Sequence, residues 1–131
     1  MIMSALRISL LASAMALGAV ANATDPSGLK AWLEPIPRGD VVEFQGYVSA
    51  PEPMLVTYRL VIERISQGGR AKTSQGGRVK ITTPNEPTRL SLTAINVRQY
   101  DSYEAELTVT GPLGQTVQAE LSRRPVNKIK I

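Results

Sequence analysis

The feature that most constrains this 131-residue chain is an alternation of apolar and polar residues with a period of two. Successive side chains of a β-strand point to opposite faces, so this alternation is typical of strands with one buried face. Nine prolines and ten glycines divide the pattern into short pieces, and helical periodicity is scarce. The mature chain is therefore predicted to be all-β.

Each piece supplies a set of residues predicted to face inward. Prolines at 51 and 53 and the segment Gly111–Gly114 mark turns between pieces. The predicted inward sets are Leu29, Ala31 and Leu33; Val42, Phe44, Gly46 and Val48; Val56, Tyr58, Leu60 and Ile62; Val79 and Ile81; Leu90, Leu92 and Ala94; Tyr103, Ala105, Leu107 and Val109; and Val117, Ala119 and Leu121.

Three details of strand ends follow from the same pattern. Pro35 and Pro37 are expected to end the first strand, and the phase slips at Ile95 and Val97, which predicts a bulge or a strand end. The segments 24–28 and 123–131 show no alternation and are expected to be unpaired.

About seven or eight short strands with turn signals roughly every 8–12 residues are typical of a sandwich or a small barrel, and the sandwich is the favoured interpretation. We predict a single immunoglobulin-like antiparallel β-sandwich. The chain has no cysteine, so the fold has no disulfide and its core must depend on Trp32, Phe44, Tyr58 and aliphatic residues. Trp32 has two interpretations, a ligand contact or a core residue, and its large apolar area favours packing in or near the core.

The first 23 residues have the features of a secretory signal peptide. Arg7 precedes an uncharged apolar run, and Ala21-Asn22-Ala23 matches a small-x-small cleavage site. The run of about 13 residues is shorter than the roughly 20 that a membrane-spanning helix needs. We therefore expect residues 1–23 to be a signal peptide and residues 24–131 to form the exported domain, periplasmic and without stable membrane insertion, with 123–131 as a basic, flexible tail.

The absence of both histidine and cysteine excludes imidazole bases, thiol nucleophiles and the commonest metal ligands. Glu104, Glu106 and Glu120 fall on outward phases of predicted strands, where ordinary solvent-facing charges are expected rather than a glycosidase pair. We predict no catalytic residue, no metal site and no cofactor, and hence a binding or structural protein rather than an enzyme.

A short motif occurs twice, as Ser66-Gln67-Gly68-Gly69-Arg70 and Ser74-Gln75-Gly76-Gly77-Arg78. One interpretation is a pair of cradles for phosphate or peptide, but the motif lacks the Lys-Ser/Thr end of a phosphate-binding loop. The favoured interpretation is two turns that flank a short strand over residues 70–73.

Basic residues cluster around this motif, and the chain carries a formal net charge of +4. Arg70 shares a strand face with Lys72, and Arg78 shares one with Lys80. Such a patch suits either electrostatic capture of an acidic partner or protection of an exposed strand edge. Nucleic acid is not expected, because no aromatic residues are interleaved with the cations. Arg59, Arg64 and Arg89 are the further cations expected to extend the patch.

Several segments, taken in order, resemble the curli assembly proteins CsgC and CsgH, and the CsgH branch more closely. The resemblance spans roughly Trp32 to Leu121. The segments are Tyr58–Arg64, Lys72–Gly77, Leu90–Thr93 with Asn96-Val97, Tyr103–Val109 and Gly114. A Ser-Gln-x-Gly step and a Tyr-x-Ala-x-Leu strand are the strongest matches.

The resemblance implies a periplasmic, seven-stranded immunoglobulin-like monomer that keeps the major curli subunit, or a similar amyloidogenic secreted protein, from polymerising too early. Some CsgC-like proteins carry a Cys-x-Cys pair, and this chain has none, so a thiol-redox role does not transfer. The expected partner-binding residues are Arg59, Arg70, Lys72, Arg78 and Lys80. The alternative is a periplasmic chaperone or adhesin accessory module of the same fold that serves another secreted or fimbrial subunit.

Overall fold

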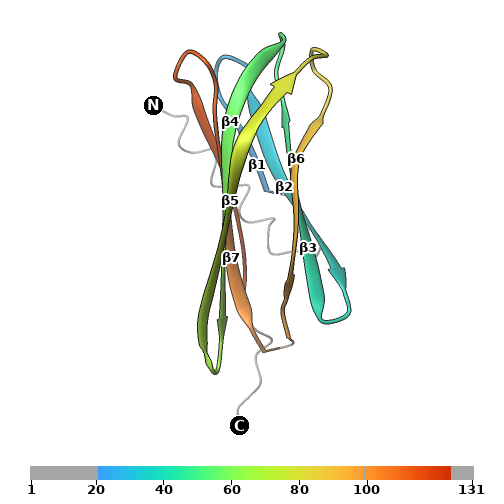
Figure 1. Cartoon of the computed structure of the whole chain (residues 1–131), viewed down its shortest axis with the longest axis vertical. Helices are drawn as coiled ribbons and strands as arrows, with labels where there is room; N and C mark the ends of the chain where they lie inside the picture. The colour runs from blue at the N-terminus through green and yellow to red at the C-terminus, as the bar shows by residue number, and fades with distance from the viewer. Residues whose placement is uncertain (1–20, 99, 125–131) are drawn as a thin grey trace.

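Two four-stranded antiparallel sheets pack face to face in the computed structural model, which describes residues 21–98 and 100–124 (Figure 1). The all-β prediction is therefore confirmed. In chain order the strands are β1 (Ala21–Thr24), β2 (Lys30–Arg38), β3 (Val41–Ser49), β4 (Met54–Ser66), β5 (Gly69–Ile81), β6 (Thr88–Asn96), β7 (Ser102–Thr110) and β8 (Thr116–Arg123). Within the described ranges no helix is long and apolar enough to cross a bilayer.

The first sheet has the strand order β1-β2-β3-β6 and the second the order β5-β4-β7-β8. The chain passes between the sheets after β3, after β5 and after β6, which is the pattern of an immunoglobulin-like sandwich. Contacts of β8 with β1 and β2 close one side of the sandwich, whereas β5 and β6 barely touch on the other side.

The core lies between the sheets and contains most of the predicted inward sets. Phe44 is fully buried, and the ring of Tyr103 meets it edge-on at a centroid distance of 4.9 Å. Tyr58 is half-buried and packs against this cluster. Leu29, Leu33, Leu60, Ile62, Leu107 and Val109 are among the residues with almost no exposed surface.

One prediction about where a strand ends is wrong, and a second is confirmed. Strand β2 continues through Pro35 and Pro37 to Arg38. Among the described residues, β1 pairs with Lys30–Leu33, and no described strand lies beside the prolines on that side of β2. The missing N–H groups of Pro35 and Pro37 therefore break no described sheet hydrogen bond. Strand β6 ends at Asn96, as the slip at Ile95 and Val97 predicted. A separate register shift opposite Gly46 and Tyr47 places a bulge at Leu90, which the sequence did not predict.

The shift at Leu90 changes which residues of β6 face inward. Leu90 and Thr93 are buried, whereas Leu92 is 47% exposed and Ala94 is also exposed. Thr93 replaces the predicted Leu92 in the core because the extra residue reverses the alternation.

Trp32 does not belong to the buried core, contrary to expectation. It is half-buried on the outer face of the first sheet, where its ring stacks on Tyr47 at 5.6 Å between centroids. Ala31 and Leu33 occupy the inward positions of the same strand. Trp32 alternates with the inward residues Ala31 and Leu33, and this alternation correctly indicates an outward side chain. Its large apolar area, which favoured the core, gave the wrong orientation.

The segment 24–28 is ordered into a hairpin rather than unpaired. Thr24 pairs with Lys30, and the Asp25 amide donates to the Leu29 carbonyl at 2.8 Å. Arg123 likewise pairs with Tyr103. Cleavage after Ala23 would remove three of the four residues of β1 and leave seven full strands. Most of the predicted signal peptide (1–20) and most of the predicted tail (125–131) lie outside the described residues.

Candidate partner-binding face

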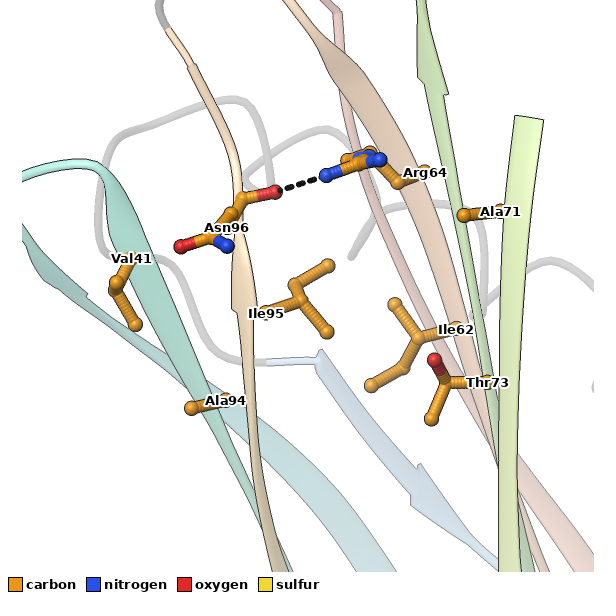
Figure 2. A pocket seen from close by; sticks show the side chains of 8 residues that line it. All are labelled: Val41, Ile62, Arg64, Ala71, Thr73, Ala94, Ile95 and Asn96. Atoms are coloured by element: carbon orange, nitrogen blue, oxygen red, sulfur yellow. Dashed lines mark hydrogen bonds between the residues drawn. The ribbon is translucent and has the colours of Figure 1, made fainter. Parts of the chain in front are cut away.

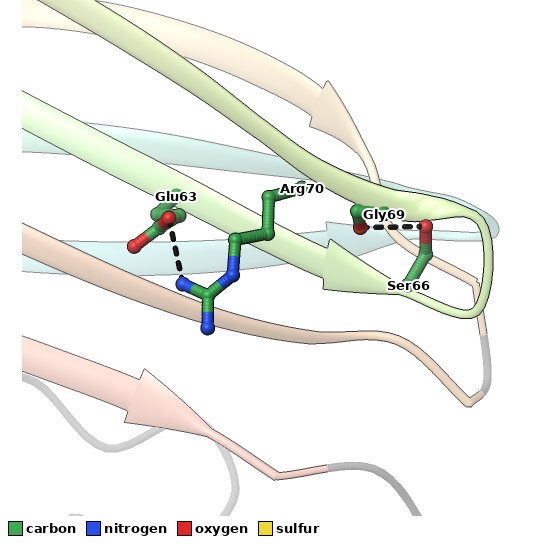
Figure 3. Close-up of polar contacts among 4 residues, drawn as sticks. All are labelled: Glu63, Ser66, Gly69 and Arg70. Atoms are coloured by element: carbon green, nitrogen blue, oxygen red, sulfur yellow. Dashed lines mark hydrogen bonds and ion pairs between the residues drawn. The ribbon is translucent and has the colours of Figure 1, made fainter.

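The two glycine motifs have different structures, and only the first forms a turn. Ser66 and Gly69 close the β4–β5 hairpin, with the Ser66 hydroxyl 3.3 Å from the Gly69 carbonyl oxygen (Figure 3). Gly69 has φ 135, a conformation that favours glycine. The predicted second turn is wrong, because β5 runs without interruption from Gly69 to Ile81.

The second glycine pair instead makes room for a neighbour in mid-strand. A Cβ atom on Gly77 would lie 3.4 Å from the ring of Tyr58, and one on Gly76 would lie 3.0 Å from the Tyr58 carbonyl oxygen. The half-buried Tyr58 ring thus lies over a strand position that has no side chain. The glycines that suggested a turn therefore serve packing against β4.

Because β5 is one continuous strand, its four cations share one face. Arg70, Lys72, Arg78 and Lys80 alternate with residues that pair with the buried side of β4, so they lie on the outer face of the second sheet. Arg59 of β4 lies opposite Gly76 on this same face. We call these five residues the basic face. Their cross-strand partners are Ile65, Glu63, Thr57, Leu55 and Gly76, respectively.

Two cations expected to extend the basic face lie elsewhere. Arg64 has the inward parity of β4, and its guanidinium donates to the Asn96 carbonyl of β6 at 3.1 Å. Arg89 lies opposite Tyr47 on the outer face of the other sheet. The alternation of each strand, combined with its assignment to a sheet, separates these side chains.

One cation of the basic face is compensated by an acidic neighbour. Arg70 Nη1 lies 2.9 Å from Glu63 Oε2, and the two side chains are 64% and 27% exposed (Figure 3). Among the described residues, no ion pair involves Arg59 or the three remaining cations of β5. The basic face therefore keeps about four uncompensated positive charges.

Apart from Glu63, the acidic residues described in the same sheet lie on β7 and β8, on the side of β4 away from β5. Glu104 of β7 pairs with Glu63, and Glu106 pairs with Glu120 of β8. All are on the outer face of a sheet, as the outward phase predicted. The outer face of this sheet is thus divided, with cations along β5 and carboxylates along β7 and β8.

Strand β5 is also the most exposed strand of the sandwich. All residues from Gly69 to Arg78 are exposed, and the strand is the end member of its sheet, with β4 as its sheet partner. The basic face therefore lies beside a strand edge with which no other described strand pairs. This arrangement fits both interpretations given to the cations, capture of an acidic partner and protection of the edge by charge.

Comparisons with protein-family models and with curated proteins find no match for this sequence. Two solved structures do share its architecture. CsgH of R. palustris superimposes with a TM-score of 0.60 at 19% identity, over 71% of this chain and 90% of that protein. The chain has the fold of CsgH and CsgC. The curli protein CsgC of E. coli gives a TM-score of 0.56 at 18% identity, over 71% of this chain and 93% of CsgC.

The predicted resemblance to CsgC and CsgH is thus confirmed for the fold. At 18–19% identity the superposition depends on shared strand order and packing rather than on shared side chains.

Proposed function

We propose that this protein is a periplasmic curli assembly factor that binds the major curli subunit, or a similar amyloidogenic secreted protein, transiently and delays its polymerisation. The observation that carries the proposal is the alignment of four cations along the exposed strand β5 of a CsgH-like sandwich. The protein acts as a monomer, and its action is binding rather than catalysis.

The basic face captures its client by long-range attraction. Clustered charges of one sign raise the rate of encounter with an oppositely charged partner more than they raise affinity. An amyloid-forming chain grows by adding strands to an exposed edge. A protein that meets the acidic client quickly and leaves quickly lowers the population of growing nuclei without being consumed in a stable complex.

The test is fibrillation of a purified curli subunit, followed by thioflavin fluorescence, with and without substoichiometric mature protein. A longer lag is expected. Replacing Arg70, Lys72, Arg78 and Lys80 together by Gln should shorten that lag toward the value without inhibitor, while circular dichroism stays that of a folded β protein. Salt above physiological strength, where the Debye length falls below about 8 Å, should have the same effect.

The matched control replaces four other cations, Lys30, Arg38, Arg89 and Arg124, by Gln. This variant has the same net charge as the first, but its altered residues lie away from the basic face. It should keep most of the inhibition. An unchanged lag in the first variant would reject the basic face as the contact. A stable one-to-one complex with a folded subunit would favour the alternative, a chaperone or accessory module.

A further inference from the structure

The side of the sandwich between β5 and β6 is open and contains a cavity of about 320 Å³. Its walls come from both sheets, β4 and β5 on one side and β3 and β6 on the other. We call this space the β5–β6 groove. Because β5 and β6 are each the end strand of a sheet, the groove meets solvent along two strand edges rather than at a loop.

The floor of the groove is apolar. Ile62 of β4 and Ile95 of β6 point toward one another, and Thr73 lies beside Ile62 (Figure 2). Ala71 adds only a methyl group on the β5 side, so β5 leaves the space unfilled. Apolar side chains that enter this space would gain buried contact with Ile62, Ile95 and Ala71.

One end of the groove is bounded by a charged group. Arg64 reaches across from β4 to the Asn96 carbonyl oxygen, as Figure 2 shows. Its Nε atom is buried and has no hydrogen-bond partner. A buried donor without a partner is unfavourable, so an acceptor brought to this end would be stabilised.

The edge of β5 supplies the remaining part of the site. Strand β5 pairs with β4 on one side, and among the described strands none pairs with it on the other. An extended chain can therefore add to this edge through main-chain hydrogen bonds, as peptides do at other open sheets. Its side chains would alternate between the groove and the outer face.

We propose that the β5 edge and the β5–β6 groove bind an extended peptide segment whose residues alternate between apolar and acidic, added to the second sheet as a further strand. The apolar side chains enter the groove between Ile62 and Ile95. The acidic side chains lie beside Lys72, Arg78 and Lys80, which have no ion pair among the described residues. This inference deepens the proposed function, since it names the contact that follows capture.

Charge argues against two other occupants of the groove. A second copy that paired through its own β5 would bring Arg70, Lys72, Arg78 and Lys80 close to the same four cations, and like charges on paired strands are destabilising. The chain's own segments outside the described ranges, 1–20 and 125–131, contain no Asp or Glu, and 125–131 carries two lysines. The favoured occupant is therefore an acidic segment of another protein.

The probe is a blocked synthetic nonapeptide of alternating Val and Glu, titrated into the full-length mature protein labelled with ¹⁵N. Amide shifts should concentrate in β5, β6 and the end of β4. Two control peptides have the same length, one with Lys in place of Glu and one with the same composition in blocks. Both should bind at least about tenfold more weakly, a difference of roughly 1.4 kcal/mol.

The decisive variant is Ala71→Phe, which fills the groove and leaves every charge in place. It should weaken binding of the alternating peptide about tenfold. Thr73→Tyr serves the same purpose if the first variant folds poorly. Ser122→Phe is the matched control, because it adds the same bulk to the outer face of β8 on the far side of the same sheet, and it should bind as the parent does.

Shifts confined to β8, or equal binding by Ala71→Phe and the parent, would overturn the inference. Self-association abolished by Ala71→Phe would overturn the choice of occupant, as would binding that appears only after residues 125–131 are removed. If Ala71→Phe loses the peptide but still delays curli fibrillation, the proposed function stands without the groove. If the parent binds the peptide and delays no fibrillation, the groove stands without the proposed function.

Discussion

The substitution Glu63→Gln should make this protein a better inhibitor by removing an acidic residue. Among the residues that the structure describes, Glu63 is the one carboxylate in an ion pair with the basic face, at 2.9 Å from Arg70. Removing its charge raises the uncompensated charge of that face from about four to about five. If a steering effect of about 10- to 1,000-fold is shared evenly by four charges, one more charge increases the association rate roughly two- to sixfold.

The cost in stability should be small. The Arg70 side chain is 64% exposed, and exposed ion pairs contribute about 0.2–1 kcal/mol to folding. Urea unfolding of Glu63→Gln should therefore differ from the parent by less than about 1 kcal/mol. A change in inhibition can then be attributed to charge rather than to loss of folded protein.

The assay is the association rate with an immobilised curli subunit at low and at physiological ionic strength, with the fibrillation lag as a second readout. The matched control is Glu43→Gln. Glu43 pairs with Arg38 at 3.3 Å on the first sheet, and the side chains of Glu43 and Arg38 are 22% and 62% exposed, respectively. Both variants have the same net charge and lose a similar ion pair.

A faster association for Glu63→Gln than for Glu43→Gln, with a difference that shrinks as salt rises, is the expected result. Equal rates for the two variants would show that total charge matters and its position does not. A slower association for Glu63→Gln would refute the reasoning altogether, because the Glu63 carboxylate would then belong to the contact.

Three further outcomes are expected. Phe44→Ala should lower the free energy of unfolding by about 3–5 kcal/mol in urea titrations, because it empties a fully buried site and removes the contact with Tyr103, and Trp32→Ala should cost clearly less; equal losses would contradict the assigned core. Burial raises the pKa of the Tyr103 hydroxyl above its ordinary value of 10.0, with Arg123 acting in the opposite direction. The stability that Tyr103 contributes is thus present below about pH 10 and is lost as pH rises through the raised pKa, so Tyr103→Phe should flatten the alkaline fall in unfolding free energy. Mass spectrometry of the exported protein should give a chain that begins at Thr24, and a start at or before Ala21 would keep β1 whole and contradict the predicted cleavage site.

Period-two alternation predicted the buried residues well in strands that contain no inserted residue of their own. Residues 42–48 and 103–109 are buried on the predicted parity because a neighbour on each side and a sheet opposite hold the whole strand in place. The prediction failed at β6, where a one-residue shift at Leu90 exposes Leu92 and buries Thr93. A bulge is defined by the pairing of one strand with its neighbour, and the alternation within β6 alone does not reveal how β6 pairs with β3.

Proline and glycine misled the prediction for a related reason. Pro37 ends a strand only if the strand needs an N–H donor there, and no described strand lies beside that part of β2 on its β1 side. Gly77 was interpreted as a turn residue, but it lies in mid-strand, where the absence of a side chain leaves room for the ring of Tyr58. The predictions used the turn preference of proline and glycine, whereas the structural effect of each residue depends on what the adjacent strand places beside it.

The sequence by itself determined the all-β class, the absence of thiol and imidazole chemistry, and the shared parity of Arg70 with Lys72 and of Arg78 with Lys80. These follow from covalent identity and from the two-residue repeat of an extended chain. Only the tertiary structure decided that the two pairs lie on one continuous strand, that Arg64 points inward, and that β5 borders an open groove. Those facts depend on which strands lie side by side, and that arrangement results from packing between residues that are far apart in the sequence.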